Sequence, residues 1–265
     1  MMHPISNNSP QQTDLLLRRI RFVLVEPTLG GNIGAVARAM KNMGLSRMEL
    51  VRPRQFPDAD ALARACGADD LLLAAGVHEN LASALSGCRL TIGSSARPRS
   101  VQWPQLDARQ CASMLLDEAR DGDVALVLGR ESSGLTNDEL GACHYLVRIP
   151  SVADFSSLNI AAAAQVFAYE LRCSALQRGA SDTSTPGAPQ RKDLATAEEM
   201  EGFYDHLTST LIAIGFADPE QSSKLQRRLR RLFNRARPDR TEINILRGML
   251  SAAAGRKRPD RFRHE

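Results

Sequence analysis

Three short stretches of the chain place small and polar side chains directly after, or directly before, apolar segments. They are "GSSAR" at residues 93–97, "GRESSG" at residues 129–134 and "SSLN" at residues 156–159. Glycine, alanine and serine leave room for a ligand to approach the backbone, whose N–H and C=O groups can then bind it. Open α/β sheets bind ligands beyond the carboxyl ends of their strands. The three stretches together therefore predict one ligand pocket.

The stretch "SSLN" has a second interpretation, because Ser and Asn are also favoured at the N-cap of a helix. The alanine-rich segment "IAAAAQVF" at residues 160–167 is typical of a buried helix, which we expect to begin near Ser156. Thr136 and Glu139 have the spacing of a capping box, which indicates that this end of the second stretch is structural. Capping and ligand binding both remain open for Ser156–Asn159.

A glycine-rich stretch, "LGGNIGAVAR" at residues 29–38, follows the first apolar run. Its glycines could allow backbone N–H groups at a helix N-terminus to approach a phosphate. The stretch lacks the G-x-G-x-x-G pattern of dinucleotide-binding proteins, and Arg52 stands where those proteins need an acid. It also lacks the Gly-Lys-Ser/Thr of a P-loop. Asn32 and Arg38 remain as polar candidates, although a lone arginine here is more often a solvated helix residue.

Apolar runs of strand length alternate with helical patterns between Ile20 and Gln177. Strands are expected at residues 20–26, 48–53, 89–95, 124–129 and 145–150, and helices at 33–43, 59–66, 81–85, 107–120 and from 156 onward. This alternation predicts an α/β fold with a mostly parallel sheet and helices on both faces.

The chain divides into unequal parts. Residues 1–18 are expected to form a disordered lead-in, and the composition of residues 178–193 indicates a flexible linker. Amphipathic helices are expected beyond it at 198–214, 224–236 and 242–253. The predicted organisation is an α/β domain at 19–177 and a basic helical module at 194–265.

Positive charge is concentrated in that module. Residues 224–265 hold 14 Lys and Arg against 4 Asp and Glu, whereas residues 1–223 hold 20 against 26. One face of the helix expected at 224–236 carries Arg227, Arg228, Arg230, Arg231 and Arg235. Such a surface is typical of a polyanionic partner. A solvated tail, or a module that stabilises a dimer, would also fit.

Several classes of protein are not supported. The five cysteines include no C-x-x-C pair and the five histidines form no ligand cluster, so we expect neither a disulfide framework nor a metal site. No apolar run approaches the roughly 18 residues that suggest a membrane span. No secretory signal is visible, so a cytoplasmic protein is expected.

The segments "NIGAVARAM", "LVLGRESSGLTNDEL" and "IPSVADFSSLNIAAAAQV" resemble the three ordered motifs of the SPOUT (TrmH-like) RNA ribose 2′-O-methyltransferases. The "GSSAR" loop, "CHY" at residues 143–145 and the C-terminal "RRLFNRARPDRTEINILRGML" resemble the bacterial TrmJ subfamily. The resemblance covers residues 19–253, apart mainly from the linker. It implies a trefoil-knotted fold, a homodimer and S-adenosylmethionine as methyl donor. The implied acceptor is cytidine or uridine of tRNA at position 32, the anticodon-loop ribose next to the stem.

The resemblance also assigns roles to individual residues. The implied cofactor-binding positions are Ser94, Ser95, Ala96, Gly129, Ile149, Ser156, Ser157 and Leu158. The implied catalytic positions are Asn32, Arg38, Glu131, Ser157 and Asn159. A guanidinium is practically never deprotonated, so Arg38 is expected to grip an RNA phosphate and stabilise developing negative charge. Glu131 is expected to orient Arg38 or Asn159.

Arg97 and Arg99 are expected to join Arg38 and the five module arginines in binding RNA. Methylation of a different tRNA or ribosomal RNA ribose remains an alternative function. A non-catalytic RNA-binding protein with the same fold is another.

Overall fold

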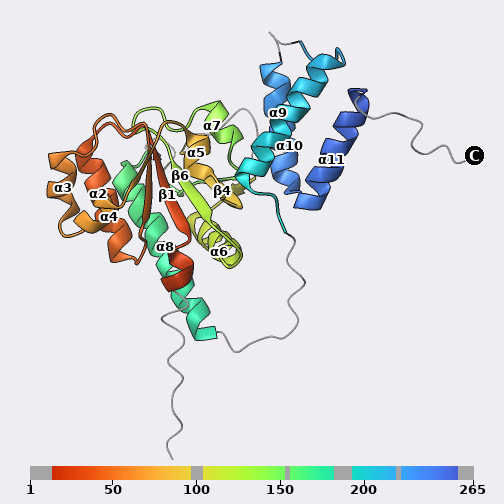
Figure 1. The fold of residues 1–265 in the computed structure, drawn as a ribbon. Coiled ribbons are helices and arrows are strands. Elements are labelled where there is room, and N and C mark those ends of the chain that lie inside the picture. The colour runs from red at the N-terminus through yellow and green to blue at the C-terminus, as the bar shows by residue number, and fades with distance from the viewer. Residues whose placement is uncertain (1–13, 97–103, 153–155, 182–192, 219–221, 256–265) are drawn as a thin grey trace, which may run out of the picture.

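The computed structural model describes residues 14–96, 104–152, 156–181, 193–218 and 222–255. Within them, seven parallel strands form one sheet in the order β3-β2-β1-β6-β4-β7-β5 (Figure 1). The five strands that the sequence predicts are present as β1 (Ile20–Val25), β2 (Arg47–Val51), β4 (Leu90–Ser94), β6 (Val124–Leu128) and β7 (Tyr145–Val147). Two short edge strands, β3 (Gly76–His78) and β5 (Gln105–Leu106), are additional. The parallel sheet confirms the α/β prediction.

Helices cover both faces of the sheet. Phe22 and Leu24 of β1 face the core formed with α2 (Gly30–Asn42), α6 (Ala108–Glu118) and α8 (Ile160–Ser181). Against α2 pack the smaller helices α3 (Ala59–Ala65) and α4 (Asp69–Leu73). Val23 and Val25 face the opposite core, where α5 (Leu81–Leu85) and α7 (Asn137–Gly141) lie. Burial on both faces explains why the strands read as unbroken apolar runs.

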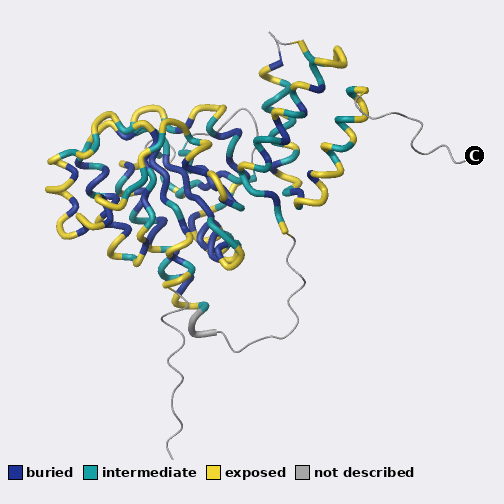
Figure 2. Tube along the Cα trace, viewed as in Figure 1, coloured by how far each residue is buried: buried dark blue, intermediate teal, exposed yellow. Residues whose placement is uncertain are grey.

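The C-terminal module is a bundle of three helices with its own core. Its helices are α9 (Ala197–Ala213), α10 (Ser223–Ala236) and α11 (Arg240–Ala253), close to the ranges that the sequence predicts. Met200, Phe203 and Tyr204 are buried in this core, and Figure 2 shows buried stretches along the helices of the module. The module also contacts the α/β domain directly, since the backbone N–H of Ala197 donates to the carbonyl of Cys88 at 2.8 Å.

Two predicted boundaries differ from the observed ones. Residues 14–17 form a helical turn in which Leu17 is fully buried, so ordered structure begins before residue 19. At the other end of the domain, α8 continues to Ser181, and Arg178 pairs with Asp117 at 2.6 Å. The predicted linker therefore begins inside a helix. The rest of the lead-in, residues 1–13, and residues 182–192 lie outside the described residues.

Candidate cofactor pocket and polar cluster

The three small-residue stretches meet at one hollow beyond the carboxyl ends of β4, β6 and β7. Its volume is about 750 Å³, with the open solvent at its mouth included. Every position expected to bind the cofactor lines it: Ser94, Ser95, Ala96, Gly129, Ile149, Ser156, Ser157 and Leu158. Arg130, Glu131, Ser132, Ser133 and Gly134 complete one wall. The convergence that the sequence predicts is present in the structure.

Gly129 is required by the wall itself. A Cβ atom at this position would lie 2.3 Å from the carbonyl carbon of Gly134 and 2.4 Å from the nitrogen of Leu135. The loop between them turns back on itself, with the N–H of Gly134 donating to the carbonyl of Arg130 at 2.9 Å. The close approach expected at Gly129 is therefore made by the loop's own backbone.

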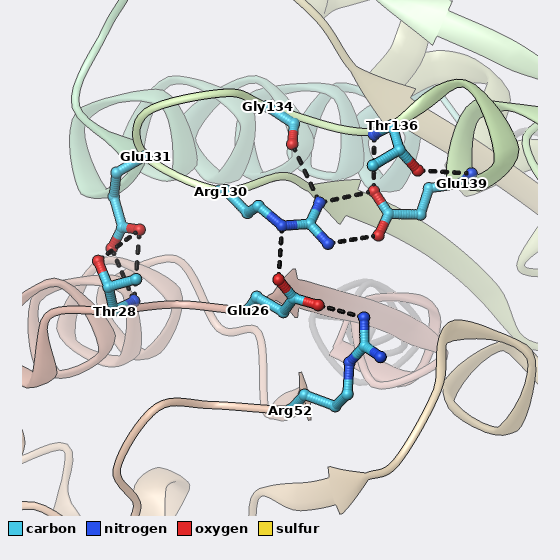
Figure 3. A network of polar contacts seen from close by, with 8 residues as sticks. All are labelled: Glu26, Thr28, Arg52, Arg130, Glu131, Gly134, Thr136 and Glu139. Carbon is cyan, nitrogen blue, oxygen red and sulfur yellow. Dashed lines mark hydrogen bonds and ion pairs between the residues drawn. The ribbon is translucent and has the colours of Figure 1, made fainter.

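A row of alternating charges holds this loop in place (Figure 3). The Arg130 guanidinium donates to Glu26 through Nε at 2.6 Å and to both carboxylate oxygens of Glu139 at 2.9 Å. Glu26 also pairs with Arg52 at the end of β2. The sequence offered only the capping box of Glu139 as a signal, and that box is confirmed at the start of α7. The roles of Glu26 and Arg130 were not predictable from it.

These contacts change how the charged groups titrate. The hydrogen bonds that Arg130 donates to the carboxylates of Glu139 and Glu26 raise the pKa of its guanidinium. The hydrogen bond from Arg130 is the main reason that the pKa of Glu26 is lowered. Burial by itself would raise the pKa of Glu139, but hydrogen bonds from Arg130 and Thr136 outweigh it, and the pKa is lowered. All three groups are therefore charged at neutral pH.

A second cluster joins three of the predicted catalytic residues beside the hollow. The Asn159 amide donates to Oδ1 of Asn32 at 3.0 Å, and the Asn32 amide donates to the Glu131 carboxylate at 3.1 Å. Thr28 donates to the same carboxylate through its hydroxyl at 3.1 Å. Burial would raise the pKa of Glu131, but these hydrogen bonds and one from its own backbone lower it. Oδ1 of Asn159 also accepts from the N–H of Ala161 at 2.8 Å, which caps α8.

Arg38 is separate from this cluster. It lies exposed on α2, six residues after Asn32, and so faces about 120° away from it around the helix. Among the described residues it makes no hydrogen bond or ion pair. Glu131 contacts Asn32 and Thr28, and it reaches Asn159 through Asn32. The structure thus does not show the expected orientation of Arg38 by Glu131.

The glycines of α2 serve helix packing. A Cβ atom at Gly34 would lie 2.0 Å from the carbonyl oxygen of Ala61 in α3, and one at Gly30 would lie 2.5 Å from the Asp58 carboxylate. The negative charge near the N-terminus of α2 is therefore supplied by the protein. The structure thus gives these glycines a packing role, which the glycine-rich stretch alone did not indicate.

The arginines of α10 divide into two groups. Arg228 and Arg235 are exposed, and Arg227 and Arg231 are half-buried. Arg230 instead pairs with Glu201 at 2.5 and 2.7 Å and lies over the Tyr204 ring at 4.4 Å. Arg230 therefore takes part in the module's own packing, and its role in RNA binding stays a prediction. Arg97 and Arg99 lie outside the described residues.

No helix in the described part of the chain combines the length and the apolar character needed to cross a membrane. Within the same ranges, no group of three or more His, Cys, Asp or Glu side chains is arranged to hold a metal ion.

Family models match both parts of the chain. The SpoU rRNA Methylase family matches residues 19–169, and the C-terminal domain of the tRNA methyltransferase TrmJ matches residues 198–262. The first match covers the α/β domain that contains the hollow. The second covers most of the basic module.

Individual relatives agree with these matches. The tRNA (cytidine/uridine/adenosine-2′-O-)-methyltransferase TrmJ of Pseudomonas aeruginosa is 50% identical over 89% of this chain and 94% of its own length. The tRNA (cytidine/uridine-2′-O-)-methyltransferase TrmJ of Sodalis glossinidius is 46% identical over 92% and 95%. The crystal structure of TrmJ from Z. mobilis superposes with a TM-score of 0.77 at 32% identity, covering 88% of this chain and 97% of that one. The chain belongs to the SpoU methylase family, and within it to the TrmJ methyltransferases.

Proposed function

We propose that this chain transfers a methyl group from S-adenosylmethionine to the ribose 2′-oxygen of cytidine or uridine in tRNA, at position 32 of the anticodon loop. The observation that carries the proposal is the hollow lined by all eight expected cofactor positions, with the Asn32–Glu131–Asn159 cluster beside it. The relatives that are named as tRNA 2′-O-methyltransferases support the choice of substrate.

The lining of the hollow fits a nucleoside cofactor. Small residues at Ala96 and Gly129 leave room beside the backbone, and the hydroxyls of Ser94, Ser95 and Ser156 can hydrogen-bond a base and a ribose. When bound, S-adenosylmethionine would supply the methyl group to be transferred, on its positively charged sulfur. The residues that would hold it are those at the ends of β4, β6 and β7 and at the start of α8.

The neighbouring polar side chains would position the acceptor. A ribose hydroxyl is a weak nucleophile, so alignment is the main contribution that a protein can make. The Glu131 carboxylate has a lowered pKa and is a weak proton acceptor at neutral pH, which favours a positioning role. Ser157 is exposed at the rim of the hollow, within reach of an incoming ribose. The exposed Arg38 would bind an adjacent phosphate.

The module would bind the tRNA backbone, and the enzyme would act as a homodimer with the family's knot. Arg228 and Arg235 are exposed guanidinium groups suited to phosphates. On α8, Tyr169 is 54% exposed and Leu176 is 53% exposed, and Leu158 is 43% exposed just before the helix. Exposed apolar side chains along one element support a subunit contact there.

The test is methyl transfer from tritium-labelled S-adenosylmethionine to bulk tRNA, followed by digestion and nucleoside mapping. Label is expected in 2′-O-methylcytidine or 2′-O-methyluridine. A tRNA with a 2′-deoxynucleotide at position 32 is the matched control and should take up no label. Label on a base, or undiminished label in the control tRNA, would overturn the proposal.

A further inference from the structure

The short helix α7 lies on the side of the α/β domain that is next to the C-terminal module (Figure 1). Its side chains and backbone contact both Arg130 in the wall of the cofactor pocket and Asn234 of the module. It has only five residues, Asn137–Gly141. A helix of this length is not stable by itself, because one turn cannot offset the cost of nucleation. Its stability must come from groups outside it, and the structure shows such groups at both ends.

The N-terminal end of α7 is tied to the pocket. Glu139 accepts hydrogen bonds from the backbone of Thr136 at 2.7 Å and from the two terminal nitrogens of Arg130 at 2.9 Å. Arg130 lines the hollow and begins the loop whose turn is closed by the hydrogen bond from Gly134. The position of α7 therefore determines where the Arg130 guanidinium and this wall of the pocket lie (Figure 3).

The C-terminal end of α7 is tied to the module. The Asn234 amide of α10 donates to the carbonyl of Gly141 at 2.9 Å and to that of Cys143 at 3.3 Å. Carbonyl groups at a helix C-terminus have no hydrogen-bond donor within the helix. Asn234 supplies such a donor to the last carbonyl of α7. The Tyr204 hydroxyl donates to Oδ1 of Asn234 at 2.6 Å and so turns the NH2 group toward α7. Asn234 is only 5% exposed and Tyr204 only 4%.

We propose that Asn234 is a positioning residue for the cofactor pocket. By completing α7, it holds Glu139, Arg130 and the loop at 129–134 in the geometry that binds the cofactor. The position of the RNA-binding module against α7 and the affinity for the cofactor are then coupled. RNA that changes this position would also change the affinity for the cofactor. This inference rests on the proposed function, since it assumes that the hollow binds S-adenosylmethionine.

The test compares two variants of the relay with one control in the full-length protein. Asn234→Ala removes the donor, and Tyr204→Phe removes only the hydroxyl that orients it. Phe203→Leu is the control, because Phe203 is a core residue of the same module that makes none of the relay hydrogen bonds. The probe is S-adenosylhomocysteine, titrated calorimetrically well below the melting temperature of each variant. Hydrogen exchange at the Gly134 N–H is the second readout.

Both relay variants are expected to bind the probe about fivefold more weakly or worse, a typical size for coupling between sites, and to exchange the Gly134 N–H faster. Phe203→Leu should lower the melting temperature but keep the dissociation constant within about twofold of the wild type. Unchanged affinity in Tyr204→Phe, or equal weakening in the control, would overturn the inference and leave the proposed function intact. If the wild type itself fails to bind the probe, the proposed function fails, and the inference fails with it.

Discussion

Replacing Arg130 by Met tests whether the charge row stabilises the loop as its geometry indicates. Methionine keeps most of the side chain's length but leaves Glu26 and Glu139 without the cation that they share. Removing one partner of a fully buried ion pair typically costs about 3–5 kcal/mol. Here the side chains of Arg130, Glu139 and Glu26 are 17%, 13% and 32% exposed, so water partly compensates. We expect a loss of about 2 kcal/mol in the free energy of unfolding.

The pH dependence of this loss has a defined sign. Glu26 and Glu139 have pKa values below the ordinary 4.5. A carboxyl group whose pKa is lower in the folded state than in the unfolded state stabilises the fold. This stabilisation is fully present above the pKa of the unfolded state, and it is lost as the pH falls through the pKa of the folded state. The difference between wild type and variant should therefore be largest near neutral pH and should shrink as the pH falls below about 4.5.

The assay is urea unfolding followed by circular dichroism, near neutral pH and again near pH 4. The control is Lys41→Met, which breaks the exposed pair with Asp70 at 2.6 Å and should cost clearly less, because water screens that pair. In a thermal melt near neutral pH, the melting temperature of Arg130→Met should be roughly 4–8 °C below that of the wild type. A cost no larger than that of Lys41→Met, or one that stays equal at both pH values, would refute the reasoning.

Three further substitutions test the pocket and its surroundings. Ser157→Ala should lower the rate of methyl transfer about tenfold or more. The melting temperature should change little, because Asn159 rather than Ser157 caps α8. Equally small effects on the rate and on the melting temperature would point away from a role in transfer. Gly129→Ala should weaken S-adenosylhomocysteine binding about tenfold, because its Cβ would lie 2.3 Å from Gly134; calorimetry showing wild-type affinity would contradict the loop geometry. Arg38→Lys keeps the charge but loses the planar fork, so transfer should slow about tenfold while S-adenosylhomocysteine affinity holds; near-normal turnover would exclude the phosphate-gripping role.

Burial on both faces made the main strands visible in the sequence. The unbroken apolar runs at 20–26 and 124–129 correspond to β1 and β6, which pair with each other at the centre of the sheet. The edge strands β3 and β5 have three and two residues and carry no comparable run. These two strands form by pairing with their neighbours in the sheet, and a local sequence pattern does not show that pairing.

The question raised by "SSLN" has a divided answer. The helix begins at Ile160, four residues later than predicted, because the Asn159 side chain caps it. Ser156, Ser157 and Leu158 stay outside the helix and line the hollow. Residue types therefore indicated both a helix cap and a position at the hollow, but only the structure shows which residue takes which place.

Contacts between residues that are far apart in the sequence could not be predicted from it. Glu26 and Arg130 are separated by 104 positions, and no spacing rule connects them. For the glycines, the sequence did not show which group comes close. The sequence indicates that something comes close at Gly34 and Gly129, but in the structure the neighbour is the protein's own backbone in both cases.

At Gly34 the main chain of one helix rests on a carbonyl oxygen of the next, with no side chain between them. A single added methyl group would push α2 outward as a rigid rod, and Asn32 and Arg38 would move with it. A substitution at Gly34 would thus displace the residues that are proposed to position the acceptor, without replacing any of them.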